Sequence, residues 1–414
     1  MSDQISHAHP NQAHEVSRRE FITGSGVAAL SFTLLKPEQA LGAESNSKIA
    51  WGLIGCGGRG GWIADLFQKH GGYSLTAVAD YFQDRVDAVG EKFQVPAARR
   101  YTGLSGYRRL LEQKLDAVVI QSPPYFHPEQ AAAAVDAGCH VYLAKPIAVD
   151  VPGCQGIADS GQKAAAKKRV FLVDFQTRAH TLYQEAIQRV HRGDIGRIVC
   201  GEATYQTSLM FSNLDARLRA APGDKDLWLR AWALDRVLSG DVITEQNIHA
   251  LDVASWILNA APLRAAGCGG KARELIGTCW DHFAVIFNYP GEVVLSFCSK
   301  QVGAGWEDIQ CRIYGTNGTI DTHYGGHVAI TGKTPFTGGA TGNLYTDGAV
   351  RSIASFYDQI TSGDYSNPTV APSVRSNLTT ILGRTAAYQR REVTWEEMIR
   401  ANEKLGCDLS SFRT

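Results

Sequence analysis

The chain has 414 residues, more than one ordinary hydrophobic core accommodates, so we expect two domains. Apolar residues make up 44% and charged residues 20% of the sequence, and 41 Lys and Arg balance 41 Asp and Glu. This is the composition of a globular protein, and the balanced charge argues against nucleic acid as a partner.

The 9 cysteines are scattered, and no two of them have the C-x-x-C spacing typical of a zinc site. Their odd number and their places within apolar runs indicate mostly free, buried thiols. We therefore expect no metal.

The N-terminal residues predict an export signal. Arg18 and Arg19 precede a modestly apolar stretch over residues 21–35, and small residues from Ala40 onward suit a cleavage site. The stretch is too short to cross a bilayer comfortably, so this order indicates a twin-arginine signal peptide over residues 1–43 rather than a disordered tail with a chance arginine pair. The twin-arginine export machinery carries folded proteins, so we expect a periplasmic protein whose cofactor was loaded in the cytoplasm. No other segment is apolar enough for a stable membrane span.

Strands and helices alternate along residues 48–175. Expected strands cover residues 48–56, 73–80, 115–124, 139–146 and 169–175. Because helical segments lie between them, the pattern predicts a parallel, doubly wound α/β sheet, the fold of dinucleotide-binding Rossmann domains.

The pattern changes from residue 176 onward and predicts an α+β domain over residues 176–414, with an open, mainly antiparallel sheet. The chain from Ala349 is expected to be mostly helical. The other expected elements are helices over residues 182–193 and 243–259, a strand near 198–206, hairpin turns at Pro290-Gly291 and Asn317-Gly318, and a Gly- and Thr-rich loop over 325–348.

A glycine-rich turn follows the first expected strand and opens a helix. Gly55, Gly57 and Gly60 match G-x-G-x-x-G, with Gly58 and Arg59 inside the turn. Glycines here allow a tight turn and let backbone N–H groups approach a pyrophosphate at the helix N-terminus. The motif alone is weak, but the strand before it and the helix after it favour a dinucleotide site over a turn without a ligand.

Asp80 ends the second expected strand, 20 residues after Gly60. A carboxylate at this point can hold both ribose hydroxyls and repels a 2′-phosphate, which favours NAD over NADP. Arg85 could pack on the adenine, but it could also reach a phosphate, so NADP is not fully excluded.

Ser122, Pro123 and His127 come at the carboxyl end of the next buried strand. In an open α/β sheet that edge faces the ligand crevice, so we expect these three residues at the cofactor. His127 could equally be the N-cap of the alanine-rich helix that follows.

Lys145 lies at the end of the strand over residues 139–146, again at the crevice edge. Pro146 biases Lys145 toward an extended conformation. A cation here would lie near the nicotinamide and could hydrogen-bond a substrate oxygen, although a surface lysine at a strand end gives the same pattern.

Glu245, His249 and Asp252 lie in the helix expected over residues 243–259, where their spacing places them on roughly one face. A histidine is the natural proton acceptor near neutral pH, and a carboxylate one turn away can orient it. A helix N-terminus with a buried, satisfied histidine fits the pattern equally well. Together with Lys145 and a dinucleotide, the set describes oxidation of a secondary alcohol, in which a base removes the hydroxyl proton.

From about residue 48 to its end, the chain resembles the glucose–fructose oxidoreductase / inositol dehydrogenase / MocA family. The resemblance rests on GLIGCGGRG, the acid of AVAD, QSPPYFHPEQAAAAVDAGCHVYLAKP and EQNIHALD. It implies an NAD(P)-binding first domain, sugar or polyol substrates, and a homo-oligomer, a dimer or tetramer, formed through the sheet of the second domain. It also implies a catalytic Lys145, which matches the lysine of the usual Glu-Lys-Pro motif, and an acid–histidine pair at Glu245 and His249.

Gln176 and Arg178 follow the last strand of the first sheet and by chain order can reach the crevice. Aromatic residues of the second domain, Trp280 among them, could stack on sugar C–H faces, although each one alone is more typical of a core. We therefore expect Gln176, Arg178, His249 and Trp280 to contact a carbohydrate substrate.

Two features depart from the family pattern. Ala144 stands where Glu is usual, which removes a negative charge beside Lys145 and is expected to lower the pKa of that lysine relative to the usual motif. The expected export is the second departure, because the periplasm supplies no ready pool of free NAD. We therefore expect NAD to stay tightly bound and to be regenerated within each catalytic cycle.

Two chemistries meet this requirement. One oxidises one sugar and reduces another; the other hydrolyses or eliminates a glycoside through transient oxidation and re-reduction of the sugar. A protein that keeps NAD but has lost its chemistry is a third hypothesis, and Ala144 keeps it open.

Overall fold

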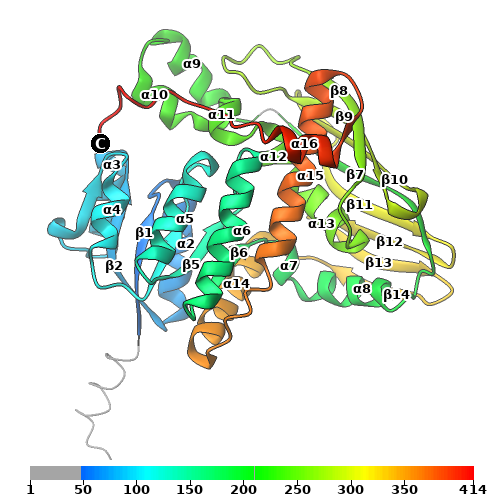
Figure 1. The fold of residues 1–414 in the computed structure, drawn as a ribbon, viewed down its shortest axis with the longest axis horizontal. Coiled ribbons are helices and arrows are strands. Elements are labelled where there is room, and N and C mark those ends of the chain that lie inside the picture. Colours follow the sequence, from blue (N-terminus) through cyan, green and yellow to red (C-terminus); the bar gives the residue numbers. More distant parts are fainter. Residues whose placement is uncertain (1–47, 209) are drawn as a thin grey trace, which may run out of the picture. The chain divides into compact units, whose positions relative to one another are not determined.

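The computed structural model describes residues 48–208 and 210–414 (Figure 1). The expected signal peptide lies outside these residues. The described chain is built on two sheets, a parallel one followed by a mainly antiparallel one, each with packed helices. The expected α/β plus α+β architecture is therefore confirmed.

The first sheet has six parallel strands in the order β3-β2-β1-β4-β5-β6. The strands are β1 (Ile49–Ile54), β2 (Tyr73–Asp80), β3 (Arg100–Thr102), β4 (Ala117–Ile120), β5 (His140–Ala144) and β6 (Phe171–Asp174). Helices connect them: α2 (Gly58–His70), α3 (Gln83–Lys92), α4 (Gly106–Leu111), α5 (His127–Asp136) and α6 (Val151–Ala166). Strands β4 and β5 are buried along their whole length because helices cover both faces of the sheet.

The strand order of this sheet reverses between β1 and β4. In a doubly wound sheet, the loops at the carboxyl ends of the strands separate at such a point and leave a crevice for a ligand. The glycine-rich turn, Asp80 and Lys145 all follow or end strands at this edge.

The second sheet has nine strands in the order β14-β13-β12-β11-β7-β10-β9-β8-β15, and within this sheet, as far as the structure describes it, only β7 and β10 pair in parallel. The strands are β7 (Ile198–Thr207), β8 (Arg264–Gly270), β9 (His282–Tyr289), β10 (Val293–Gln301), β11 (Asp308–Gly315), β12 (Gly318–His323), β13 (His327–Gly332), β14 (Phe336–Ala340) and β15 (Val393–Thr394). Both expected hairpins, β9–β10 and β11–β12, are confirmed.

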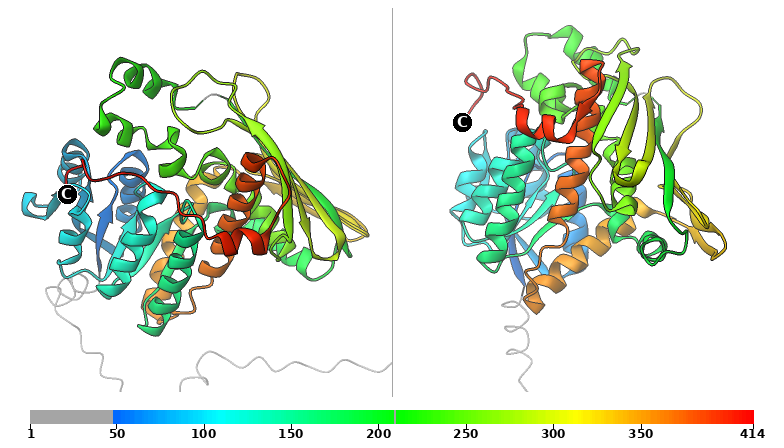
Figure 2. Two further views of the ribbon diagram at one scale, coloured as in Figure 1. Left: turned by 45° about the horizontal axis from the view of Figure 1, so that its top comes forward. Right: turned by 45° about the vertical axis from the view of Figure 1, so that its right-hand side comes forward.

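Helices α8, α13 and α15 pack on this second sheet, and β9 and β10 alternate buried and exposed residues, so one face of these strands is left bare. Figure 2 shows the sheet from two further directions. The helices of this part are α7 (Gln176–Ala179), α8 (Thr181–His191), α9 (Ser212–Ala220), α10 (Lys225–Arg230), α11 (Arg236–Ser239), α12 (Val242–Glu245), α13 (Ile248–Leu258), α14 (Leu344–Ser362), α15 (Val370–Gln389) and α16 (Trp395–Ala401).

The prediction of a loop over residues 325–348 was wrong. It contains β13 and β14, which extend the second sheet, and the start of α14. Val328 and Ile330 lie two residues apart on one face of β13 and are buried at 0% and 2% exposure. Their burial outweighs the low strand preference of the surrounding glycines.

Helix α14 lies in the helical layer of the first sheet although it comes late in the chain. Its residues Ala349, Ile353 and Phe356 share a core with β1 and β2, and Phe356 packs edge-on against Phe67 and Tyr142. A chain boundary at residue 176 therefore separates this helix from the sheet that it covers.

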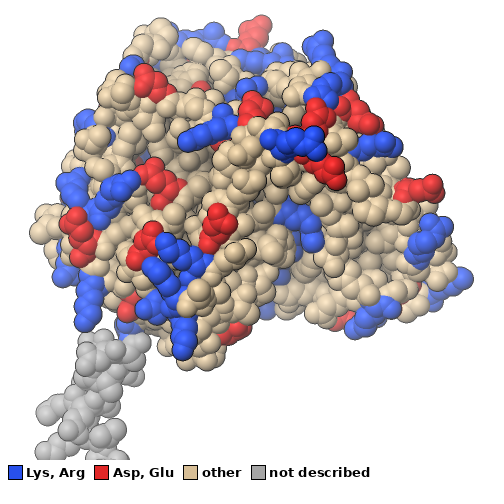
Figure 3. All heavy atoms as spheres, viewed as in Figure 1, with Lys and Arg blue, Asp and Glu red and all other residues tan. Residues whose placement is uncertain are grey.

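All 9 cysteines are free in the structure, and five of them are buried. Cys200, Cys268 and Cys298 are exposed on the second sheet. The expectation of mostly buried thiols therefore holds for five of the nine cysteines. Positive and negative side chains are interspersed over the face in Figure 3. Within residues 48–208 and 210–414, no helix combines the length and apolarity needed to cross a bilayer, and no group of His, Cys, Asp and Glu could hold a metal ion.

Candidate active site

The glycine-rich turn joins β1 to α2 and requires glycine at two positions. Gly55 has a φ of 94°, and a Cβ there would lie 2.5 Å from the backbone of Gln121. A Cβ at Gly60 would lie 1.8 Å from the carbonyl oxygen of Gly55. Gly57 and Gly58 line the crevice instead, where the N-terminus of α2 presents its free N–H groups. Such a helix end favours a phosphate, so the turn fits a dinucleotide.

Asp80 ends β2 at the rim of the same crevice. Its two carboxylate oxygens accept hydrogen bonds from the backbone N–H of Cys56, at 2.7 Å, and of Phe82, at 2.9 Å. These bonds fix the carboxylate, and each oxygen keeps a lone pair for a ribose hydroxyl. Burial raises the pKa of Asp80, and the Phe82 N–H and the charge of Arg85 oppose the rise. The residues present therefore fit NAD.

Arg85 lines the crevice, and its guanidinium lies 4.9 Å from the ring centre of Phe82. Arg230 of α10 lies over the same ring, at 4.0 Å, and donates two hydrogen bonds to Asp84, at 2.8 and 3.0 Å. A second arginine therefore stands near Asp80, from a part of the chain with no sequence motif to reveal it.

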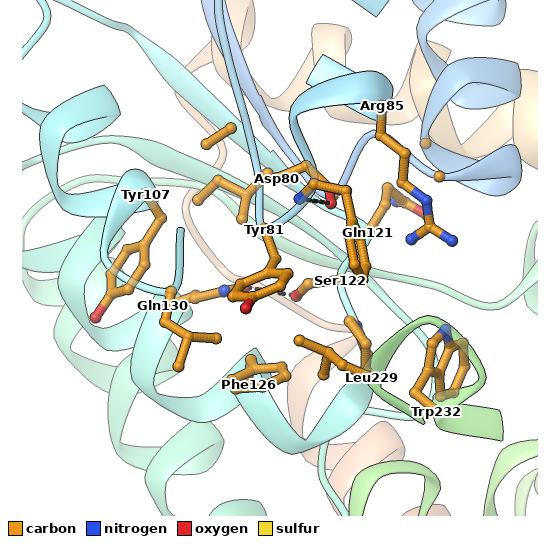
Figure 4. A pocket seen from close by; sticks show the side chains of 18 of the residues that line it. Asp80, Tyr81, Arg85, Tyr107, Gln121, Ser122, Phe126, Gln130, Leu229 and Trp232 are labelled. Atoms are coloured by element: carbon orange, nitrogen blue, oxygen red, sulfur yellow. Dashed lines mark hydrogen bonds between the residues drawn. The ribbon is translucent and has the colours of Figure 1, made fainter. Parts of the chain in front are cut away.

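Ser122 and Pro123 follow β4 and line the crevice as expected (Figure 4). Ser122 donates its hydroxyl to Gln130, at 2.5 Å. Both amide atoms of Gln121 are buried without a partner, so this side chain offers a donor and an acceptor to a ligand. Gln121 was missed because a lone glutamine before a Ser-Pro-Pro stretch has no recognisable pattern.

The expected cofactor contact at His127 is contradicted. The ring is 1% exposed; Nδ1 lies 2.8 Å from the carbonyl oxygen of Pro146 and Nε2 lies 2.7 Å from that of Ser122. Both nitrogens therefore face backbone carbonyls. The alternative N-cap role is also wrong, because Phe126 is the N-cap residue of α5. His127 instead braces the loops that follow β4 and β5.

Leu229 and Trp232 close the crevice from the second part of the chain. They come from α10 and the 3-10 turn Trp232–Leu234, and they lie across the crevice from Gln121 and Ser122 (Figure 4). Residues from both parts of the described chain thus line one pocket.

Lys145 directly follows β5, and its side chain is 8% exposed. Its Nζ donates to the backbone carbonyl of Glu245, at 2.6 Å, and to the Oε1 of Glu245, at 3.3 Å. Burial lowers the pKa of Lys145, and the charge of Glu245 opposes this. A lowered pKa was expected from Ala144, but burial is its main cause.

The helix expected over residues 243–259 is broken between Glu245 and His249. In an unbroken helix, the carbonyl of Glu245 would accept from the N–H of His249. Here that N–H bonds to Gln246, at 3.3 Å, and the Glu245 carbonyl is taken by Lys145. The break between α12 and α13 therefore turns a backbone carbonyl into a ligand for the lysine.

His249 lies at the start of α13, and its ring packs edge-on against that of Tyr324, with 5.2 Å between the ring centres. Burial lowers the pKa of His249 well below its ordinary value, and the charge of Lys145 adds to this, so the ring is neutral at neutral pH. Among the described residues no carboxylate orients the ring, contrary to expectation. Glu245 binds Lys145, and Asp252 binds Arg178.

The expected substrate residues divide into two groups. Gln176 is fully buried beside Asp174, with its Oε1 unpartnered. Arg178 is bound by Asp252 through three hydrogen bonds of 2.8–3.1 Å, so its guanidinium is already engaged. Trp280 stacks on Tyr388 at 3.8 Å, which gives its ring a structural partner. Gln176 keeps a free acceptor, whereas Arg178 and Trp280 already have protein partners, and their contact with a substrate stays a prediction.

Buried polar atoms without a partner gather near Lys145. Native interiors rarely leave such atoms unpaired, so their concentration indicates a site for a polyhydroxy ligand. They are Glu245 Oε2, both amide atoms of Asn247, His249 Nδ1, Asp174 Oδ1, Gln176 Oε1 and Tyr324 Oη.

Two family models match the chain. The NAD-binding Rossmann fold of the GFO/IDH/MocA oxidoreductase family covers residues 49–175, and the GFO/IDH/MocA C-terminal domain covers residues 183–321.

Curated relatives fall into two functional classes. An inositol 2-dehydrogenase of Salmonella paratyphi B is 25% identical over 275 residues, which cover 65% of this chain and 72% of that protein. An alpha-N-acetylgalactosaminidase of Shewanella oneidensis is 27% identical over 217 residues, which cover 46% of each chain.

Solved structures share the fold. An oxidoreductase from Agrobacterium radiobacter, in complex with NAD+, L-tartaric acid and magnesium, superposes with a TM-score of 0.67 at 17% identity, over 85% of this chain and 99% of that one. Together with the nucleotide crevice, these matches show that the chain belongs to the GFO/IDH/MocA family of NAD-binding oxidoreductases.

Proposed function

We propose that the chain is an NAD-dependent oxidoreductase that acts on a secondary alcohol of a sugar or glycoside. The observation that supports this best is the pairing of a buried lysine with a neutral histidine among unpartnered polar atoms. Lys145 follows β5 at the carboxyl edge of the first sheet, and His249 lies in the first turn of α13, just after Glu245, the partner of Lys145. Bound NAD+ would supply the hydride acceptor for the substrate C–H.

Each residue has a distinct role in this proposal. Lys145, held by Glu245, hydrogen-bonds the reacting hydroxyl and stabilises negative charge as its proton leaves. His249 accepts that proton on a ring nitrogen, since its neutral state at neutral pH leaves one nitrogen free. Gln176 binds a further hydroxyl group through its unpartnered Oε1, and Asn247 does so through its unpartnered amide.

A glycoside hydrolase is the second candidate, and the galactosaminidase relative favours it. In that chemistry a sugar carbon would be oxidised by the bound cofactor, the glycosidic group eliminated, water added to the resulting double bond, and the keto group reduced again by the same cofactor, so no net redox change results. The same lysine and histidine would serve, because both chemistries begin by removing a hydroxyl proton.

We further propose that NAD is retained between turnovers, and the C-terminal segment, residues 407–414, supports this. It runs back to the first sheet (Figures 1 and 2), where Leu104 donates its N–H to the carbonyl of Arg413, at 2.9 Å. The ring of Phe412 packs edge-on against Tyr81, at 5.9 Å. Lys225 of α10 bonds Ser411, at 2.6 Å. The segment thereby ties the crevice rim at Tyr81 to the helix that bears Leu229.

Retention matters because we also propose export through the twin-arginine pathway, directed by residues 1–43. Cell fractionation tests the proposed export: the variant Arg18→Lys/Arg19→Lys should stay in the cytoplasm.

We propose a homo-oligomer as well, formed through the bare face of the second sheet. Val199, Ile286 and Val294 are exposed there at 38–43%, on three neighbouring strands. Light scattering of the purified protein tests this.

The two chemistries are separated by product analysis. Purified protein is incubated with a panel of aryl glycosides and aldoses, without added nucleotide. An aldonolactone with a reduced second sugar supports the oxidoreductase, and a released aglycone supports the glycosidase. Bound NAD with no product from any substrate would contradict both and would favour a protein that has lost its chemistry.

A further inference from the structure

Ala144 leaves the lysine without its usual carboxylate neighbour in the chain, but a carboxylate lies on the adjacent strand. Asp174 ends β6 and is paired in register with Ala144 of β5. Side chains at paired positions of parallel strands point to the same side of the sheet, and the strands are about 4.8 Å apart. A carboxylate at position 174 is therefore one strand away from where a glutamate at position 144 would begin.

Asp174 has one occupied and one free oxygen. The residue is fully buried, its Oδ2 accepts from Arg59, at 2.6 Å, and Gln176 donates to the same oxygen, at 3.4 Å. Its Oδ1 accepts no hydrogen bond among the described residues, and the buried hydroxyl of Tyr142, which lies beside Asp174, is likewise without a partner. A buried carboxylate is costly unless all its acceptor sites are used, so the free oxygen points to a ligand.

Arg59 reaches Asp174 from the glycine-rich turn. Its guanidinium donates to the hydroxyl of Tyr345, at 2.7 Å, and lies 5.5 Å from the ring centre of Trp62 and 5.4 Å from that of Tyr345. Burial disfavours the charge, but Asp174 raises the pKa of Arg59 above its ordinary value. The arginine is therefore held as a fixed cation.

The pair belongs electrostatically to the lysine site. The charge of Arg59 lowers the pKa of Lys145, and that of Asp174 raises it. Two cations, Lys145 and Arg59, thus face two anions, Glu245 and Asp174. The four charges cancel, so a neutral ligand keeps the site balanced, whereas an anionic one adds a charge that nothing matches.

We propose that Asp174 takes the place of the carboxylate that the Ala-Lys-Pro motif lacks, and that its free oxygen binds a hydroxyl group of a neutral sugar. This rests on the proposed function and deepens it by naming the substrate class. Asp174 acts as a binding residue, and Arg59 acts as a positioning residue that holds its carboxylate in place.

Moving the carboxylate from position 174 on β6 to position 144 on β5 tests, without any substrate, whether Asp174 replaces the missing glutamate. Asp174→Ala should lower the melting temperature, because Arg59 loses its partner. The double variant Ala144→Glu/Asp174→Ala should recover at least half of that loss, because Glu at 144 can reach Arg59. Ala144→Glu alone should be destabilised, since it places two carboxylates together. No recovery in the double variant would overturn the proposal.

Turnover provides the second readout, on whichever neutral sugar of the panel the wild type converts. Asp174→Asn, which keeps the shape, should raise KM on the order of 10–100-fold. Asp136→Asn, the matched control at an exposed carboxylate at the end of α5, should change KM less than threefold. A KM unchanged in Asp174→Asn would overturn the proposal while leaving the oxidoreductase intact. A wild type that converts no sugar would overturn the proposed function. The melting temperatures would still show whether a carboxylate at position 144 can replace Asp174.

Discussion

Replacing Lys145 with methionine removes one buried cation from the carboxyl edge of the first sheet while keeping a side chain of similar length. The lysine is 8% exposed and gives hydrogen bonds to two oxygens of Glu245. A positioned group of this kind contributes about 10²–10⁴-fold to the rate of proton transfer. We expect turnover to fall by at least that factor. NAD should remain bound, because Gly57, Gly58 and Asp80 are untouched.

The same substitution should cost less stability than a broken buried ion pair usually does, which is about 3–5 kcal/mol. Burial already raises the pKa of Glu245, and Lys145 opposes the rise. Once the lysine is gone, only the charge of Arg59 opposes the effect of burial, so the pKa of Glu245 rises further and proton uptake relieves part of the cost of an unpaired charge. The free energy of unfolding should therefore fall by less than about 3 kcal/mol.

Three measurements on one preparation check this prediction: turnover, NAD content after denaturation, and urea unfolding. Lys163→Met is the matched control, since Lys163 is 52% exposed on α6 and its ion pair within the described residues is with Asp136. It should match the wild type in all three. Unchanged turnover in Lys145→Met would refute the role of the lysine, and loss of NAD together with activity would reduce that role to cofactor binding.

His249→Ala should lower kcat by about 10²–10⁴-fold if His249 is the base. The control His327→Ala, at an exposed strand end, should leave kcat unchanged. A loss below tenfold in His249→Ala would show that His249 has only a structural role. Burial lowers the pKa of His127 to about 4 from 6.5, so the unfolded chain binds its proton first. Stability should be full above pH 6.5 and fall by about 3 kcal/mol toward pH 4, and the urea midpoint of His127→Asn should show a smaller fall. Deleting residues 407–414 removes the packing of Phe412 on the crevice rim, so NAD should dissociate on the order of tenfold faster; an unchanged rate measured by nucleotide fluorescence would rule out the retaining role.

Local patterns revealed the elements and most of the cofactor site. The turn from Gly55 to Gly60, Asp80 and Lys145 all follow strands of the first sheet, and the strand–helix alternation places such residues at one edge. Their positions depend on chain order and strand direction, which a sequence shows.

Other features depend on contacts between distant segments. The role proposed for Asp174 depends on its strand register with Ala144 and on its bond to Arg59, 115 residues away. His127 has the residue type of a ligand, but the carbonyl of Pro146 occupies its ring. Arg178 and Trp280 likewise found protein partners, and no local pattern distinguishes a side chain bound within the fold from one left for a substrate.

The nucleotide content of the exported protein tests the central claim most directly. The protein is purified from the periplasm without added cofactor and denatured, and the supernatant is assayed enzymatically for NAD(H) and NADP(H). The account predicts close to one NAD(H) per chain and little NADP(H), because Asp80 stands where a 2′-phosphate would lie. A protein that is folded and active but releases no nucleotide would contradict it.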